Sequence, residues 1–314
     1  MKKKILIIGI SGQDGAYLAK LYLDKKIYEV HGIVRSQNNP NLETLGIRKL
    51  LKIHLIKNFK DSNRNKLIKI LKINFDKIFF FGGQSSVKDS FKDKEYETYE
   101  SQILPVREIL EYLRKSKKKT KFLFAASSEM YGDMKKKKIS ERSKTEALSP
   151  YALSKIASYE IIKSYRLMFN LPVFSMIFFN HESDLRRKDY VIKKIILGVK
   201  NIKKGKQKKI VLGNINVKRD WGWAPEFMNI CYKAINHREI NDYVLATGQT
   251  VSLKHVIMTV FKINNLNWKN HVDISKNHIR TSEIRENYAN ISFIKKKIKN
   301  ETKIKNRANF KTIK

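Results

Sequence analysis

Short apolar runs alternate with longer segments of helical periodicity through the first half of the chain. The runs are continuously apolar, which is typical of strands buried on both faces of a sheet. They lie at 4–10, 28–34, 52–56, 77–83, 121–127 and 173–179. The segments between them are predicted to be helices, at 15–26, 61–73, 96–116 and 150–169. Because strand–helix alternation favours parallel strands with right-handed crossovers, the sequence predicts a doubly wound α/β fold.

The pattern changes after about residue 180. Helices are predicted at 190–205 and 225–236, the second opened by Pro225, and short strands at 210–213 and 242–248. In the rest of the chain the apolar runs are shorter and the composition is more polar. This change indicates a second, smaller domain after the parallel sheet.

A glycine-rich turn joins the first predicted strand to the first helix. Gly9, Gly12 and Gly15 lie in the stretch GISGQDG, with Gln13 and Asp14 between the last two glycines. Such a turn lets the backbone approach a pyrophosphate, whose charge the following helix N-terminus favours. A plain structural turn is the alternative, since glycine also makes turns without a ligand. The position after a strand and before a helix favours a dinucleotide-binding, Rossmann-type sheet.

Two later strand ends add candidate contacts to a cofactor. The second strand ends in Arg35. A site that prefers NAD usually has an acidic residue here, which accepts a hydrogen bond from the ribose 2′-hydroxyl. A guanidinium suits a 2′-phosphate, so NADP is expected, and an ordinary solvated arginine is the alternative. The fourth strand ends in a glycine loop, where Gly82 leaves room for a ligand and Gln84 and Ser85 offer hydrogen bonds.

Five Tyr-x-x-x-Lys pairs occur in the chain, and context selects one of them. Ser149 and Pro150 are strong signals for a helix start, and they place Tyr151 and Lys155 on one face of that helix. We expect the Lys155 ammonium to lower the pKa of the Tyr151 phenol, so that it can act as a base. The other four pairs are Tyr22/Lys26, Tyr131/Lys135, Tyr159/Lys163 and Tyr190/Lys194.

The preceding strand delivers further polar groups to the same edge. Ser127 and Glu129 follow the fifth strand, at the carboxyl end where open α/β sheets bind ligands. None of the other four pairs has a polar strand end beside it. Ser127, Glu129, Tyr151 and Lys155 are therefore the candidate catalytic group.

Composition and charge argue against several kinds of partner, location and site. The formal charge is +37, with 66 Lys and Arg against 29 Asp and Glu. The lysine runs are scattered and lack interleaved aromatics, so a generally lysine-rich surface is favoured and nucleic-acid binding is not expected. The single cysteine, Cys231, argues against disulfides and for a reducing, cytoplasmic location. No apolar run is long enough to span a bilayer, and no metal site is expected, since His181-Glu182 has no second histidine at helical spacing.

The glycine triplet, Ser-x-Glu and Tyr-x-x-x-Lys, in this order, resemble the extended short-chain dehydrogenase/reductases. Within them the chain is most similar to the GDP-mannose 4,6-dehydratase family. The stretches that match are GISGQDGAYLA (9–19), EVHGIVRS (29–36), GGQSSVKDSF (82–91), ASSEMYG (126–132), SPYALSKIASYE (149–160), FNHESDLRRKDYVIKKI (179–195), LGNINVKRDWGWAPE (212–226) and DYVLATGQTVSL (242–253).

The resemblance implies a role for each catalytic candidate. Tyr151 would take the proton of the sugar 4-hydroxyl as a hydride passes from C4 to NADP, and Lys155 would bind the nicotinamide ribose. Glu129 would remove the C5 proton and help water leave from C6. Ser127 would polarise the 4-oxygen, where the family often has threonine.

The resemblance also implies a nucleotide-sugar site in the smaller domain. The matching substrate-side positions are Ser85, Asn180, Val191, Lys194, Arg219, Arg280 and Glu283, and the two arginines would meet the diphosphate. It implies an NADP-binding Rossmann domain at 1–178, returning at about 211–247. The nucleotide-sugar-binding domain would take 179–210 and 248–314. A homo-oligomer, dimer or tetramer, is expected.

Two other functions stay open at this point. A related nucleotide-sugar epimerase or 4-keto reductase would share the cofactor site, but a simple reductase lacks the base for C5 that Glu129 would supply. A degenerate Rossmann protein that binds polyanions through its positive charge should have broken catalytic positions. All four catalytic candidates are present, which favours an enzyme.

Overall fold

The computed structural model describes residues 2–91, 94–116, 118–275 and 283–298. Its centre is a seven-stranded parallel sheet in the order β11-β7-β5-β4-β1-β2-β3. Most of its strand residues are buried, as their continuous apolar runs predict. The strands are β1 (Lys3–Ile8), β2 (Tyr28–Val34), β3 (Lys52–Leu55), β4 (Lys77–Phe80), β5 (Lys121–Ser127), β7 (Val173–Phe178) and β11 (Tyr243–Leu245).

Two groups of helices cover this sheet, as a doubly wound fold requires. The first group packs together as α1 (Gln13–Asp24) and α9 (Ala224–Asn236). The second group comprises α3 (Asp61–Leu71), α5 (Glu95–Gln102), α6 (Leu104–Lys115) and α7 (Pro150–Phe169), which pack against one another. The predicted doubly wound fold is therefore confirmed.

The single helix predicted at 96–116 is wrong. It is divided into α5 and α6, and Pro105 lies in the first turn of the second helix. Proline has no backbone N–H and clashes with the preceding turn, so a new helix starts there more readily than an old one continues. Among the described residues, four short helices complete this part: α2 (Pro40–Thr44), α4 (Val87–Ser90) and the 3₁₀ turns η1 (Arg48–Leu50) and η2 (Ser128–Tyr131).

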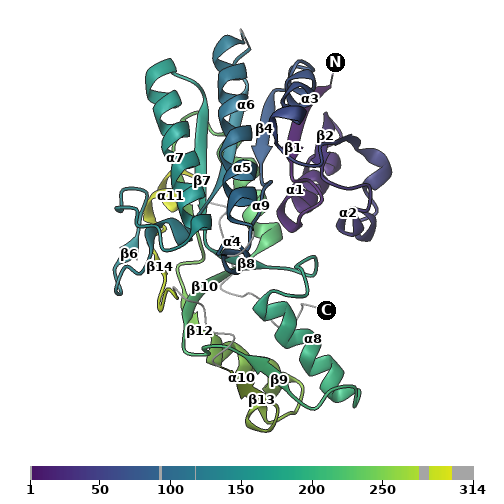
Figure 1. Ribbon diagram of the computed structural model, residues 1–314, viewed down its shortest axis with the longest axis vertical. Coiled ribbons are helices and arrows are strands. Elements are labelled where there is room, and N and C mark those ends of the chain that lie inside the picture. Colours follow the sequence, from purple (N-terminus) through teal and green to yellow (C-terminus); the bar gives the residue numbers. More distant parts are fainter. Residues whose placement is uncertain (1, 92–93, 117, 276–282, 299–314) are drawn as a thin grey trace.

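A smaller lobe lies at the opposite end of the molecule from α3 and α6 (Figure 1). Its own hydrophobic cluster includes Ile196, Leu212, Trp221 and Phe261, separate from the cluster around the large sheet. Its helices are α8 (Val191–Lys203), α10 (Leu253–Ile263) and the 3₁₀ turn η3 (Trp268–Asn270). Its strands are β8 (Asn180–Glu182), β9 (Ile210–Leu212), β10 (Lys218–Trp223), β12 (Thr250–Ser252) and β13 (Val272–Ile274).

Strand pairing joins distant parts of the sequence in this lobe. β10 lies between β12 and β8, and β9 pairs with β13. Near the C-terminus, β14 (Tyr288–Ala289) pairs with β6 (Lys138–Ile139), and α11 (Ser292–Lys297) follows. The division into two domains with the boundaries given above stays a prediction. None of the described helices is long and apolar enough to cross a membrane.

Candidate functional site

The glycine turn after β1 fits closely against the end of β4. Gly9 has a positive φ of 82°, and a Cβ built on it would lie 2.7 Å from the backbone nitrogen of Gly82. A Cβ on Gly15 would lie 2.4 Å from the Gly9 carbonyl oxygen. Gly12 precedes α1, and no side chain caps that helix. The backbone therefore lies open at a helix N-terminus, which fits a pyrophosphate.

Gln13 and Asp14 connect this turn to β8. His181 Nε2 lies 2.9 Å from Asp14 Oδ1, and Ser183 Oγ donates to Gln13 Oε1 at 2.7 Å. Burial alone would raise the pKa of Asp14, but the charge and hydrogen bond of His181 more than offset it and hold this pKa below its usual value. The partly buried Asp14–His181 pair thus fixes the glycine turn against the first strand of the smaller lobe.

The loop after β4 places its polar side chains in different surroundings. Gln84 is buried, and its Nε2 donates to the Ser86 carbonyl at 2.8 Å. Its Oε1 is buried and has no hydrogen-bond partner among the described residues. Ser85 is exposed, and its Oγ lies 3.1 Å from the Tyr190 hydroxyl. Of these two candidates, Ser85 faces the start of α8, where substrate residues were predicted.

Tyr151 and Ser127 meet where β5 ends and α7 begins. The Ser149 side chain accepts from the Ala152 backbone N–H and starts α7, as the sequence predicts. Burial raises the pKa of the Tyr151 phenol, and a hydrogen bond with Ser127 works in the opposite direction. The nearby charge of Glu129 raises it further, so Tyr151, Ser127 and Glu129 form one group.

Lys155 lies behind Tyr151 on the same helix. Its Nζ donates to the Ala125 carbonyl at 2.7 Å and lies 5.7 Å from the centre of the Tyr151 ring. Burial lowers the pKa of Lys155 to about 7, against the opposing effect of Asp14. The expected lowering of the Tyr151 pKa is absent, because burial dominates that group and Lys155 is itself desolvated.

Arg35 lies at the end of β2, where a ribose phosphate was expected. Its side chain is exposed, and Nη1 donates to Glu97 Oε1 of α5 at 3.2 Å. An exposed guanidinium with one weak surface partner can turn toward a ligand at little cost.

The predicted substrate-side residues lie in the smaller lobe and at its border. Asn180 opens β8, and Val191 opens α8. Lys194 Nζ donates to the Val211 carbonyl at 2.7 Å, and Glu283 accepts from Asn214 at 2.7 Å. Arg280 lies outside the described residues.

Arg219 is buried and bonded to backbone carbonyls. It is only 6% exposed, and its Nη2 donates to the Ile284 carbonyl at 2.7 Å. Its Nη1 donates to the carbonyl of Lys218 at 2.9 Å. In this structure the guanidinium therefore stabilises the chain that follows the predicted Arg280–Glu283 segment.

Sequence reasoning missed three residues beside the catalytic group. Arg186 is partly buried and pairs with Glu182, with 3.4 Å between Nε and Oε2, and its guanidinium lies 3.7 Å from the centre of the Tyr190 ring. The charges of Arg186 and Tyr190 both act on the Tyr151 phenol. The three residues are His181, Arg186 and Tyr190, which all lie in the stretch FNHESDLRRKDYVIKKI. Its match to the family was the one signal that could have identified them.

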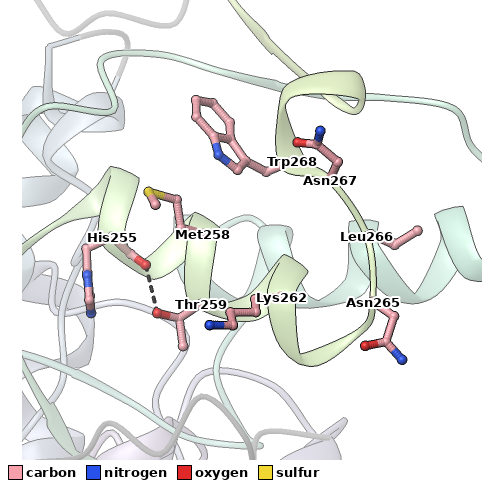
Figure 2. Close-up of a pocket in the computed structure, with 8 residues that line it drawn as sticks. All are labelled: His255, Met258, Thr259, Lys262, Asn265, Leu266, Asn267 and Trp268. Atoms are coloured by element: carbon pink, nitrogen blue, oxygen red, sulfur yellow. Dashed lines mark hydrogen bonds between the residues drawn. The ribbon is translucent and has the colours of Figure 1, made fainter.

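Two hollows on the surface contain none of the predicted site residues. One, of about 610 Å³, lies on α10 and the segment after it (Figure 2). The close-up shows Met258 and Trp268 above an open helix face, with Thr259 Oγ1 donating to the His255 carbonyl at 2.9 Å. The other, of about 540 Å³, includes Arg142 and Asp242. We therefore place the site by its chemistry, at the ends of β1, β4 and β5.

The grouped side chains can perform paired proton transfers. A serine hydroxyl and a tyrosine phenol can share one oxygen of a substrate, while a carboxylate stands within electrostatic range. A buried lysine beside them supplies positive charge or a hydrogen bond. The glycine turn lies at the same edge of the sheet, so a dinucleotide and a second substrate could meet there.

Comparisons with known proteins agree with this geometry. A family model described as GDP-mannose 4,6 dehydratase matches residues 6–313. GDP-mannose 4,6 dehydratase 1 of Arabidopsis thaliana is 33% identical over 296 residues, which covers 90% of this chain and 81% of that protein. GDP-mannose 4,6-dehydratase of Vibrio cholerae O1 El Tor is 35% identical over 271 residues, with 82% and 70% covered.

Solved structures share the fold at lower identity. The dTDP-glucose 4,6-dehydratase of Streptomyces venezuelae, solved with NAD, has a TM-score of 0.81 at 18% identity and covers 94% of this chain and 90% of its own. The UDP-glucuronic acid 4-epimerase of Bacillus cereus, also with NAD, has a TM-score of 0.81 at 20% identity, with 94% and 92% covered. The family model and the sequence relatives confirm the predicted resemblance, and the chain belongs to the GDP-mannose 4,6-dehydratase family.

Proposed function

We propose that the protein is a nucleotide-sugar 4,6-dehydratase that converts GDP-mannose to GDP-4-dehydro-6-deoxy-mannose and water. The observation that supports it best is the presence of Glu129 beside the Tyr151–Ser127 pair. A 4-epimerase or 4-keto reductase needs the hydroxyl pair but has no use for a base at C5. Membership of the family favours the dehydratase over both.

The proposed reaction assigns one proton transfer to each of two side chains. Tyr151 removes the proton of the 4-hydroxyl, and Ser127 donates a hydrogen bond to the same oxygen as C4 becomes a ketone. The ketone acidifies the C5 proton, which Glu129 removes. Glu129 then returns this proton to the C6 hydroxyl, which leaves as water. Tyr151 then gives C5 the proton that it took from the 4-hydroxyl, so the only net change in the sugar is the loss of one water.

We also propose NADP as the resident cofactor. When bound, it stores the hydride from C4 and supplies it again at C6, so the dehydration needs no added oxidant. A Cβ at Gly9 or Gly15 would collide with backbone atoms, so these positions require glycine, and the uncapped N-terminus of α1 beside them suits the pyrophosphate of NADP. Gly12, Gln13, Asp14, Gly82 and Gln84 line the same turn and the neighbouring strand end. Lys155 is placed to bind the nicotinamide ribose.

Purified protein incubated with a panel of nucleotide sugars and NADP⁺ tests the activity. We expect GDP-mannose alone in the panel to give a product lighter by one water, read by mass spectrometry. Absorbance at the NADPH band should show no net change over many turnovers, because the hydride returns to the sugar. Steady accumulation of NADPH would instead indicate a plain dehydrogenase and would contradict the proposal.

Replacement of Arg35 by Ala tests the cofactor. Wild-type protein is expected to bind NADP⁺ more tightly than NAD⁺, by roughly 10- to 100-fold if Arg35 makes a charge-assisted contact with the 2′-phosphate. Arg35→Ala should remove that preference and leave NAD⁺ affinity unchanged, as measured by calorimetry. Glu97→Gln is the matched control, since it breaks the surface pair with Arg35 and should keep the preference. Equal affinities in the wild-type protein would exclude this role.

Exposed apolar side chains on α7 support a homo-oligomer. Leu167 and Met168 are 73% and 63% exposed, and Leu153 is exposed on the same helix. Apolar side chains gathered on one helix favour pairing with a second copy of the chain. Light scattering that gives a monomer mass at micromolar concentration would contradict this proposal.

A cytoplasmic location is likewise proposed, from the single buried Cys231, and cell fractionation tests it.

A further inference from the structure

A segment near the C-terminus ties the smaller lobe to the catalytic group. We call residues 283–290 the C-terminal strap. Its carbonyls at Ile284 and Asn287 accept from Arg219 Nη2 at 2.7 Å and from Thr250 Oγ1 at 2.8 Å. The Lys218 backbone N–H donates to Arg285 at 2.8 Å, and the Lys218 side chain pairs with Glu286. The strap is therefore fastened to β10 and β12.

One side chain of the strap reaches the turn that contains the proposed base. Asn287 Nδ2 donates to Ser128 Oγ at 3.0 Å. Asn287 is 1% exposed and Ser128 is 3% exposed, so water does not compete for this bond. Asn287 Oδ1 has no partner among the described residues, which makes Ser128 the side chain that holds the amide. A buried hydrogen bond of this kind fixes the position of both groups.

Ser128 and Glu129 are neighbours in the short turn η2. The Glu129 backbone N–H donates to Ser127 Oγ at 3.3 Å, which anchors the turn to the end of β5. The Glu146 N–H donates to the Met130 carbonyl at 2.8 Å and anchors its other side. A 3₁₀ turn of four residues has few bonds of its own, so each outside anchor restricts where Glu129 can lie.

We infer that Asn287 is a positioning residue for Glu129, which it aligns with the sugar through Ser128. This inference rests on the proposed dehydratase function. It also joins the predicted substrate residues to the base, because Asn180 lies on β8, which pairs with β10, and Glu283 begins the strap. A misplacement of the base by about 1 Å lowers a rate by roughly 10²-fold, so a single anchor can matter.

The test compares two steps of one turnover in Asn287→Leu. Leucine is similar in volume but cannot bond Ser128. We expect kcat for dehydration to fall by roughly 10- to 100-fold, with KM changed by less than about threefold. In a rapid single turnover, bound NADPH should form at nearly the wild-type rate and then persist, because oxidation at C4 depends on Tyr151. A purely structural role of Asn287 would slow oxidation at C4 and dehydration together. The ratio of these two rates, which we call the partition, would then stay at its wild-type value.

Two further variants complete the design. Ser128→Ala removes the other partner of the hydrogen bond and should give the same partition as Asn287→Leu. The double variant should dehydrate the sugar no more slowly than either single variant, because both substitutions remove the same bond. Asn290→Ala is the control, since the side chain of this strap residue accepts from the Ser292 N–H at the start of α11 and, among the described residues, makes no hydrogen bond to η2, so the variant should behave as wild type.

The two proposals fail in different ways. If the wild-type protein dehydrates GDP-mannose but Asn287→Leu and Ser128→Ala leave the partition unchanged, or their effects add fully, Asn287 is not a positioning residue. If Asn290→Ala shows the same partition as Asn287→Leu, general loosening of the strap explains the effect and the inference is again overturned. A wild-type protein that dehydrates no nucleotide sugar contradicts the proposed function itself, and the inference falls with it.

Discussion

Replacing Tyr151 by Phe is expected to lower turnover of GDP-mannose by roughly 10²–10⁴-fold, the range for loss of a general acid–base group. The ring stays and only the phenolic oxygen is removed, so binding should survive. Bound NADPH should form more slowly by the same factor in a single turnover, because the 4-hydroxyl loses the group that takes its proton. Stopped-flow absorbance and a substrate-binding measurement by calorimetry together separate these two effects.

Tyr159→Phe is the matched control for this substitution. Tyr159 lies on the same helix, has lysine at the same spacing, and is also buried. Its partner Lys163 instead forms a weak surface pair with Glu160 at 3.9 Å. Turnover should stay near the wild-type value, even if thermal stability falls slightly because Tyr159 lies beside Asp242. Equal damage in the two variants would show that the wrong pair was chosen.

The parallel strands of the large sheet and the start of α7 could be predicted because both depend on local signals, whereas the catalytic role of Tyr151 stays a prediction. Continuous apolar runs identify the parallel strands, and Ser149 and Pro150 identify the start of α7. The side chain of Ser149 caps α7 as expected. Signals of this kind need no knowledge of distant segments, which explains their success.

Features that depend on long-range contacts could not be predicted. The strand β10 lies between β8 and β12, which come from opposite sides of it in sequence, and no period in the sequence identifies it. α10 has an apolar face, but the helix was not predicted because the segments around it are polar. Tyr190/Lys194 was set aside because no polar strand end was found beside it, yet Tyr190 contacts Ser85 and acts on Tyr151.

Electrostatics gave the clearest difference between expectation and structure. From spacing alone, Lys155 should lower the pKa of Tyr151. Burial instead raises the Tyr151 pKa and lowers that of Lys155 to about 7, because both groups lose solvation together. A bound anionic ligand near Lys155 would favour its charged form, which in turn would favour the phenolate. We therefore expect activation of Tyr151 to require a bound ligand as well as the Tyr151–Lys155 pair.

Glu129→Gln is expected to stop the reaction after its first half. The amide is nearly the same size as the carboxylate but cannot take the C5 proton, so dehydration should fall by roughly 10²–10⁴-fold. Oxidation at C4 needs Tyr151 and Ser127, both unchanged in this variant. Bound NADPH should therefore appear in a single-turnover trace at close to the wild-type rate, without a product lighter by one water.

The trapped species makes this variant more informative than a simple loss of activity. Mass spectrometry of the quenched complex should show a sugar lighter by two hydrogens, the 4-keto form, in an amount equal to the NADPH. The mass balance requires this equality, since each hydride leaves one ketone behind. Glu97→Gln is a suitable control, because Glu97 is a surface carboxylate on α5 that pairs with Arg35. Full dehydration by Glu129→Gln would show that another group removes the C5 proton. Absence of both NADPH and product would assign Glu129 to the first step or to binding, because a base that acts only at C5 cannot affect the oxidation that precedes it.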